Sequence, residues 1–207
     1  NKEKKNFIIN SVPMVISSLL APYIHEFQRD YPNLNIQMDS DPKTLDFAIK
    51  ELDVAIRRTK GDEPNLVYVP IFKIAITPIC RHDYFAINPD INPDTLENSR
   101  LIRLTADMHN WTHWLKQWDY KAPLGNELLL SSFRSVTESV RSGAGIAMGY
   151  QPMINDLLKE GEIITPFVNK ISTYSEAYLV YRKKDENKLI IKEFEAWLKA
   201  LIKLLAW

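Results

Sequence analysis

The chain has 207 residues, 45% hydrophobic and 25% charged, which is enough apolar material for one large domain or two small ones. Lys plus Arg and Asp plus Glu both total 26, and this balance argues against binding of nucleic acid by this chain alone, because such proteins carry a basic excess. The single cysteine, Cys80, excludes an intrachain disulfide and fits a reducing compartment, and no apolar run approaches the roughly 20 residues of a membrane span.

The first third of the chain alternates apolar runs with segments of helical spacing. The expected order is strand, helix, strand, helix, strand over residues 7–10, 11–30, 34–38, 44–51 and 52–56. Ser11 is the expected N-cap of the first helix, and Pro22 inside that helix predicts a kink. Such alternation is typical of a parallel sheet covered by helices, whose ligands bind beyond the carboxyl ends of the strands.

Polar side chains follow each of these strands. They are Asn10 with Ser11, Asp39 with Ser40, and Arg57 with Arg58. Two interpretations of the arginine pair stay open. Either both guanidinium groups face solvent above packed stems, or one reaches into the ligand site and pairs with a carboxylate.

The rest of the chain repeats the strand and helix alternation without a sequence repeat. Strands are expected at 66–80, 101–104, 128–130, 145–150, 163–167 and 177–181, and helices at 131–142, 152–160 and 189–205. An aromatic segment with Trp111, Trp114 and Trp118 is expected to pack in the core rather than to form a ligand platform. We expect two α/β subdomains, with the chain crossing near residues 77–80 and returning near Val180.

The stretch from Ser131 to Gly149 carries two signals. Gly143 and Gly145 follow a helix and precede a strand, so they predict a helix cap and a tight turn rather than a dinucleotide-binding loop. At the other end of the helix, Ser131 and Ser132 either cap the helix or bind an anion with their hydroxyls and the free N–H groups.

No spacing in the chain proposes catalysis. His109 and His113 are four residues apart with Asp107 nearby, but the neighbouring tryptophans favour packing over a metal site. Phosphate-binding, serine-hydrolase and zinc-protease motifs are absent. We therefore expect no enzyme activity, metal or cofactor.

Seven segments in register carry a family resemblance over nearly the whole chain. They include Leu52-Asp-Val-Ala-Ile-Arg57 and Trp111-Thr-His-Trp-Leu115, with the others at 20–36, 69–80, 140–148, 158–167 and 177–181. On these segments the chain resembles the effector-binding domain of LysR-type transcriptional regulators. Two of them look most like the branch that includes regulators of glycine cleavage and of β-lactamase induction.

The resemblance implies a fold and a role. The family domain has two Rossmann-like subdomains joined by two crossover strands, similar to periplasmic binding proteins of type II. Here these would be residues 1–78 plus 180–207, and 79–179. The family's winged helix-turn-helix would precede this chain and carry all DNA contacts. The resemblance also implies a cytoplasmic protein without membrane contact that forms a homodimer, or a tetramer in the full-length regulator. In the homodimer, the first helix of one copy packs on the second subdomain of the other.

The resemblance further implies a small effector in the cleft between the subdomains, such as an amino acid, a small acid or a cell-wall fragment. The residues carried over by position are Ser11, Val12, Pro13, Met14, Ser40, Asp41, Arg57, Arg58, Thr105, Ser131, Ser132 and Phe133. Asp39 and Asp41 place negative charge where many relatives have Thr or Ser, which disfavours an anionic effector or favours an amine. The alternative function is a solute-binding protein of the same fold.

Overall fold

The computed structural model describes residues 5–40, 52–121 and 124–205, so the helix expected at 44–51 lies outside the described residues. The chain divides into two compact units, one from residues 1–73 and 175–206 and the other from residues 74–174. Both divisions fall within long strands, β4 (Leu66–Ile79) and β8 (Ser172–Arg182). The boundaries expected at 78 and 180 lie in the same two strands.

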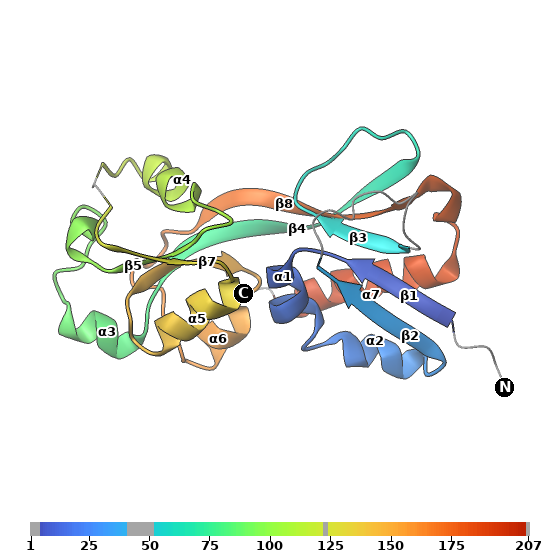
Figure 1. The fold of residues 1–207 in the computed structure, drawn as a ribbon, viewed down its shortest axis with the longest axis horizontal. Helices are drawn as coiled ribbons and strands as arrows, with labels where there is room; N and C mark the ends of the chain where they lie inside the picture. Colours follow the sequence, from blue (N-terminus) through green and yellow to red (C-terminus); the bar gives the residue numbers. More distant parts are fainter. Residues whose placement is uncertain (1–4, 41–51, 122–123, 206–207) are drawn as a thin grey trace. The chain divides into compact units, whose positions relative to one another are not determined.

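The first unit is built on parallel strands. β1 (Lys5–Asn10) pairs in parallel with β2 (Leu34–Asp39) along its whole length and with β3 (Val54–Arg57) at its end (Figure 1). Parallel pairing requires the chain to cross back over the sheet between strands. The carboxyl ends of these strands therefore share one edge of the sheet, and Asn10 stands opposite Asp39 there.

The first helical segment is broken as Pro22 predicts. A short helix α1 (Pro13–Val15) leads into a π-helical turn at Ile16–Leu20, and α2 (Ile24–Asp30) begins only after Pro22. The N–H of Ala21 donates to the carbonyl of Ile16 at 2.8 Å, the five-residue spacing of a π turn.

The expected N-cap at Ser11 is wrong. Val12 occupies the cap position without any side-chain hydrogen bond. The hydroxyl of Ser11 instead donates to the carbonyl of Ile56 in β3 at 3.3 Å. The side chain is therefore bonded to a neighbouring strand and not to an N–H group of the helix start.

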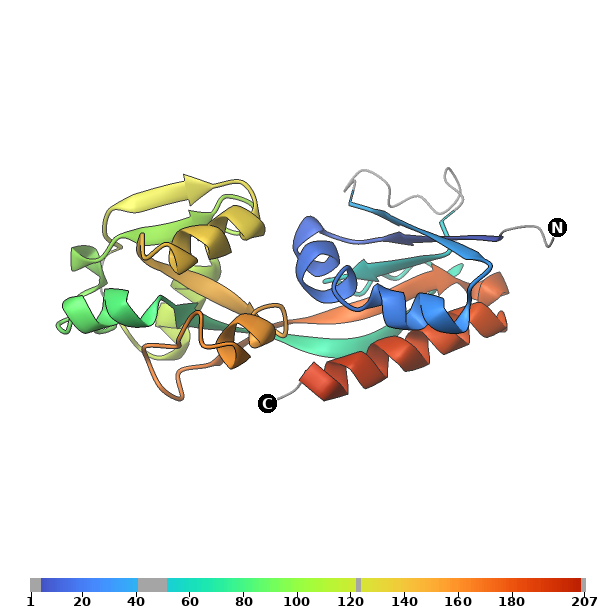
Figure 2. The same cartoon turned by 90° about the horizontal axis from the view of Figure 1, so that it is seen from below.

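Aromatic side chains fill the core of the first unit. Phe7 of β1, Phe27 of α2 and Phe194 of α7 (Leu189–Leu205) meet with ring centroids 5.3 to 6.3 Å apart. Trp197 adds a fourth ring 5.6 Å from Phe27. These contacts hold α2 and α7 side by side against the sheet (Figures 1 and 2).

The second unit has its own parallel strands. β5 (Leu101–Leu104) pairs in parallel with β6 (Glu127–Leu130) on one side and β7 (Ile146–Gln151) on the other, and β7 pairs antiparallel with β4. Helix α5 (Phe133–Arg141) packs on β5, β6 and β7. The described part of this unit also contains α3 (His82–Ile87), α4 (Asn110–Gln117), α6 (Asn155–Lys159) and a 3-10 turn at Leu96–Asn98. A further 3-10 turn, at Lys183–Asp185, belongs to the first unit.

The strand expected at 163–167 is wrong. This segment makes a single bridge, in which Ile164 and Cys80 exchange two backbone hydrogen bonds of 2.8 and 3.1 Å. Pro166 has no N–H with which to continue the ladder, so the pairing stops after one residue.

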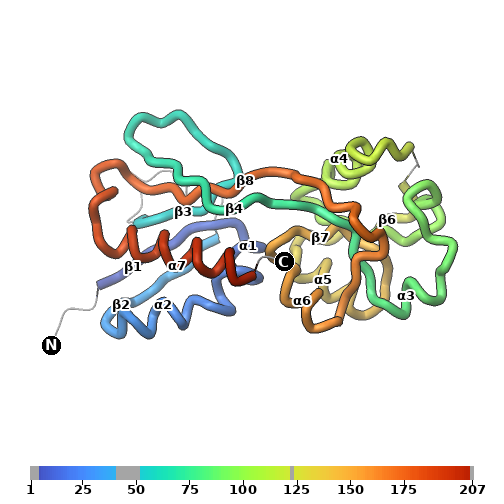
Figure 3. The backbone as a smooth tube through the Cα atoms, turned by 180° about the vertical axis from the view of Figure 1, so that it is seen from behind, coloured from blue at the N-terminus to red at the C-terminus, as the bar shows by residue number. Residues whose placement is uncertain are grey.

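β4 and β8 run beside each other and each contributes residues to both units (Figure 3). Among the described residues, the hydrogen-bonded order is β2-β1-β3-β8-β4-β7-β5-β6. β2 and β6 are thus the edge strands of this order. The described part of the chain contains no helix with the length and hydropathy of a bilayer span.

Replacement of Phe194 by alanine tests the aromatic core. Phe194 is fully buried and contacts rings from β1 and α2, so Phe194→Ala should lower the free energy of unfolding by about 3–5 kcal/mol. Leu204→Ala on the same helix, where the side chain is 74% exposed, should change it by less than about 0.5 kcal/mol. Urea unfolding followed by circular dichroism measures both, and equal losses would contradict this description of the core.

Candidate functional site

Ser11 joins the ends of three strands in the first unit. Its N–H donates to the carbonyl of Asp39 in β2 at 3.1 Å, and its hydroxyl donates to the carbonyl of Ile56 in β3. Only 2% of the residue is exposed. Ser11 therefore links the carboxyl ends of these strands. Its hydroxyl hydrogen is donated to a backbone carbonyl.

Arg57 turns its guanidinium onto Asn10. Nη2 donates to the side-chain oxygen of Asn10 at 2.6 Å, and Nη1 lies 3.4 Å from the Asn10 carbonyl and 3.1 Å from that of Ile56. The Nε of Arg57 is buried and has no hydrogen-bond partner among the described residues. Burial lowers the pKa of Arg57 from its ordinary value, which still leaves the group charged at neutral pH.

Asn10 is a strand-end residue that the set of predicted site residues lacked. It is 2% exposed although it ends an apolar strand, and a buried amide at the carboxyl end of a parallel strand is the signal that could have identified it. Its contact with Arg57 matches neither interpretation of the arginine pair in full, because this guanidinium is turned away from solvent and the partner that the structure shows is an amide rather than a carboxylate. Arg57 is held over the strand ends, whereas Arg58 is exposed.

The other predicted residues of the first unit surround this junction. Val12 and Pro13 are exposed and Met14 is half-buried at the start of α1. Ser40 is half-buried directly after β2, and Asp41 lies outside the described residues. α1 has only three residues, so its start offers little of the partial positive charge expected of a longer helix.

In the second unit, Thr105 and Ser131 follow two paired strands. The N–H of Thr105 donates to the carbonyl of Leu130 at 2.9 Å, which places Thr105 next to Ser131 beyond the carboxyl ends of β5 and β6. Both residues are exposed, so both hydroxyls are available to a ligand.

Ser132 is the N-cap of α5, as the sequence predicts. Its hydroxyl oxygen accepts the N–H of Ser135 at 3.1 Å and lies 2.8 Å from the hydroxyl of Ser135. Phe133, 3% exposed, presents its ring edge to Tyr150 at a centroid distance of 5.4 Å. Phe133 is therefore a core residue that anchors the start of α5.

A buried polar cluster behind Phe133 was missed by the sequence-based set. Asp107, 8% exposed, accepts the hydroxyl of Tyr150 at 3.0 Å and that of Tyr174 at 2.6 Å. The side chain of Asn110 also donates to the Tyr150 hydroxyl at 2.7 Å. Burial, with Asp107 as the next cause, raises the pKa of Tyr150 above its ordinary value, so this hydroxyl remains a donor.

The sequence offered a weak signal for this cluster. Asp107 stood near His109 and His113 as a candidate metal ligand, yet its partners are tyrosines 43 and 67 residues away. His113 places Nε2 3.1 Å from the carbonyl of Thr173, and His109 is the N-cap residue of α4. Within residues 5–40, 52–121 and 124–205, no group of three or more His, Cys, Asp or Glu side chains is placed to hold a metal ion.

The structure thus brings the predicted residues together in two clusters, one in each unit. The strand-end cluster of the first unit contains Asn10, Ser11 and Arg57. The hydroxyl cluster of the second unit contains Thr105, Ser131 and Ser132, with Asp107 and its tyrosines behind them. Each lies where the carboxyl ends of its own parallel strands meet.

Comparison with known families decides the class of protein. The model of the LysR substrate-binding domain matches residues 2–203. The chain belongs to this family. The LysR substrate-binding domain is the effector-binding part of LysR-type regulators, so the match favours that class over a solute-binding protein.

Curated relatives of this LysR domain are transcriptional regulators. The HTH-type transcriptional activator AmpR of Pseudomonas aeruginosa is 24% identical over 181 residues, which cover 86% of this chain and 60% of the relative. The glycine cleavage system transcriptional activator of Escherichia coli is 20% identical over 194 residues, covering 93% of this chain and 63% of the relative. The chain therefore spans only about three fifths of the length of these regulators, which are not enzymes.

Solved structures show the same fold. The effector domain of AmpR from Pseudomonas aeruginosa has a TM-score of 0.76 at 20% identity and covers 97% of this chain and 96% of its own. The CrgA regulatory domain from Neisseria meningitidis has a TM-score of 0.74 at 18% identity, with 98% and 100% covered. The LysR domain described here thus has the type II periplasmic-binding-protein-like fold.

Removal of one tyrosine hydroxyl tests the buried cluster. Tyr150→Phe leaves Asp107 and Asn110 without a shared partner in a buried place, so it should cost about 1–3 kcal/mol of unfolding free energy. Tyr178→Phe removes a hydroxyl bonded to Glu176 in a partly exposed place and should cost less than about 0.5 kcal/mol. Chemical unfolding of both variants gives the comparison, and a neutral Tyr150→Phe would show that the cluster does not stabilise the unit.

Proposed function

We propose that this chain is the effector sensor of a cytoplasmic, DNA-binding LysR-type regulator. The observation that carries the proposal is the family match over residues 2–203, together with polar clusters at the carboxyl ends of the parallel strands in both units. DNA binding would reside in the part of the protein that lies outside this chain. The effector would act by binding one state of the regulator more tightly and so raising its population.

The two clusters differ in the chemistry that they offer to an effector. In the first unit, the charged guanidinium of Arg57 lies at the strand ends with its Nε unused by the described residues. In the second unit, Thr105 and Ser131 present exposed hydroxyls that both donate and accept hydrogen bonds. Each cluster by itself suits a small polar effector, with Arg57 favouring a carboxylate and the hydroxyls accepting either a donor or an acceptor. Candidates are an amino acid, a small acid or a cell-wall fragment.

Substitution of Ser132 separates effector binding from helix capping. Ser132→Ala should lose the cap, about 1 kcal/mol of stability, and weaken effector binding. Ser132→Asp keeps a good cap but loses the hydroxyl donor, so it should retain stability and still weaken binding by about tenfold. A thermal-shift screen of amino acids, dicarboxylates and muramyl peptides identifies the ligand, and calorimetric titration then measures its affinity.

Ser142→Ala is the matched control, because this exposed serine ends the same helix. Its affinity for the ligand from the screen should equal that of the unchanged chain. Undiminished affinity in Ser132→Asp would remove Ser132 from the site, and a screen without any stabilising ligand would count against the sensor function.

We also propose that the chain forms a homodimer through the edge strand β6. Leu129 is 50% exposed and Leu128 is 36% exposed on this short strand, which pairs on one side only among the strands that the structure describes. An edge strand that shows apolar side chains is a template for pairing or packing with another chain. In the pairing implied by the family resemblance, the second subdomain of one copy receives the first helix of the other, and β6 belongs to that second unit.

A charge on β6 tests the dimer. Leu129→Lys should raise the dimer dissociation constant by at least about tenfold, because the lysine ammonium would have to be buried at the interface. Leu204→Lys, at a side chain of α7 that is exposed to 74%, should leave it unchanged. Sedimentation velocity over a concentration series measures the constant, and equal values for both variants would exclude β6 from the interface.

A further inference from the structure

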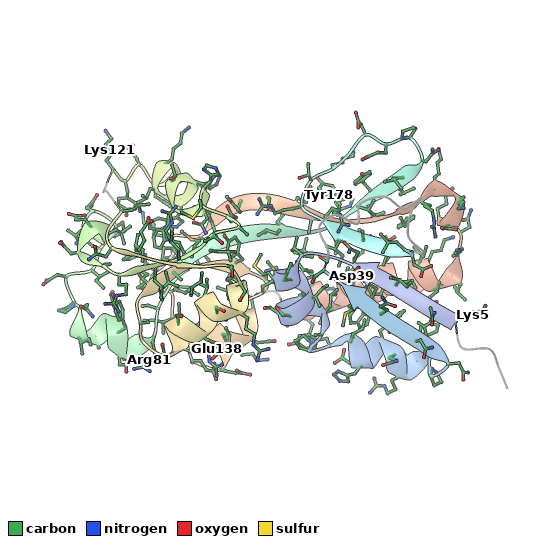
Figure 4. All side chains as sticks on the ribbon, in the orientation of Figure 1. Lys5, Asp39, Arg81, Lys121, Glu138 and Tyr178 are labelled. Carbon is green, nitrogen blue, oxygen red and sulfur yellow. The ribbon has the colours of Figure 1, made fainter. Side chains whose placement is uncertain are left out.

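A further candidate binding site lies at the amino ends of the parallel strands in the first unit, opposite the strand-end cluster. A pocket of about 830 Å³ is formed within the first unit by the starts of β1, β2 and α7, a size typical of small-molecule sites. β1 and β2 are parallel, so Lys5 and Leu34 mark their amino ends and Asn10 and Asp39 mark their carboxyl ends. Lys5 and Asn10 are five residue steps apart along the strand, about 17 Å. Figure 4 shows Lys5 and Asp39 at opposite ends of these strands.

The walls of this pocket at the amino ends of the strands are largely apolar. Phe7 forms part of its lining and continues into the aromatic core, where it meets Phe194. Leu189 lines the pocket although 69% of it is exposed, and Ile190 and Leu34 lie beside it half-buried. Phe7 itself is only 1% exposed. An apolar group that settles on Leu189, Ile190 and Leu34 would remove their surface from water, which is favourable by about 25 cal/mol for each Å² covered.

The rim of the pocket carries charges of both signs. Lys5, Arg182 and Lys188 line it, against the single carboxylate of Asp53, which accepts a backbone N–H of β1 at 2.9 Å. Asp185 binds Arg182 at 2.6 Å and Lys188 at 3.0 Å and neutralises one further charge. Glu193 is hydrogen-bonded to Tyr31, which also lines the pocket. These carboxylates therefore already have partners, whereas Lys5 is exposed without an ion pair in the described part of the chain.

We propose that this pocket binds a monocarboxylate with a medium-length apolar tail, of the kind found in a medium-chain fatty acid. The carboxylate would lie between Lys5 and Lys188 at the rim, and the tail would cover Leu189 and reach toward Phe7. A bare inorganic anion would leave the apolar wall in water, and a cationic amphiphile would meet carboxylates that already have partners. The site is separate from both clusters of the proposed effector function, so either can fail without the other.

Octanoate is the probe for this pocket. Calorimetric titration of the chain should show saturable binding, and the melting temperature should rise with octanoate concentration. Two matched compounds separate the contributions. Butanoate keeps the carboxylate with a shorter tail, and octylammonium keeps the tail with the opposite charge, so each should bind at least about tenfold more weakly.

Variants of α7 place the binding in the pocket. Leu189→Asp and Lys188→Glu should each weaken octanoate binding by about tenfold or more, and Lys5→Glu gives a third variant that leaves the pair with Asp185 untouched. Leu204→Asp and Lys203→Glu are the same changes at exposed positions near the other end of the helix and should leave the affinity unchanged. Ser132→Asp should also bind octanoate normally.

Four results would overturn the proposal. They are no binding of octanoate at millimolar concentration, equal binding of octylammonium, undiminished binding in the three pocket variants, and loss of binding in Ser132→Asp, which would assign octanoate to the effector site. Sedimentation with and without octanoate adds a further check. Dissociation of a dimer by octanoate would mean that a second copy of the chain, and not a fatty acid, covers this pocket.

Discussion

Parallel pairing of β1 with β2 and β3 is the constraint on which the first unit depends. It brings the carboxyl ends of three strands to the same side of the sheet. Backbone N–H and C=O groups beyond these ends cannot pair with another strand and must find other hydrogen-bond partners. Ser11 and Arg57 supply those partners, through Asp39, Ile56 and the carbonyl of Asn10. The polar residues at this edge thus serve the sheet as well as any ligand.

The second unit meets the same constraint differently. Here the strand ends carry exposed hydroxyls, and the buried partner is a carboxylate, Asp107, that collects two tyrosine hydroxyls from β7 and β8. A buried carboxylate is costly unless it is fully hydrogen-bonded, so this cluster fixes the positions of its neighbours. Phe133 packs on one of these tyrosines, Tyr150, and this contact holds the start of α5 against the cluster.

Periodicity and local chemistry were enough to predict much of this arrangement from the sequence. The alternation of residues 7–56, the break at Pro22 and the cap at Ser132 each depend on neighbours within a few positions, and the structure shows all three in the described residues. The failures concern distant partners. The hydroxyl of Ser11 binds a carbonyl 45 residues away, and Asp107 meets tyrosines 43 and 67 residues away, distances at which local patterns carry no information. The strand expected at 163–167 had the right composition but lacked a partner beyond Cys80.

The π-helical turn at Ile16–Leu20 has a consequence for how this sequence can change. Each of its hydrogen-bonded rings holds one residue more than an α-helical ring, so a chain one residue shorter at this point could run as a regular helix. Such a deletion would rotate everything before it by about 100° relative to α2. Leu19 and Leu20, both fully buried, lie next to that register change. A relative with a single-residue deletion at 16–20 would therefore present a different face of the segment after Ser11 to the rest of the unit, while the core around Phe27 would stay in place.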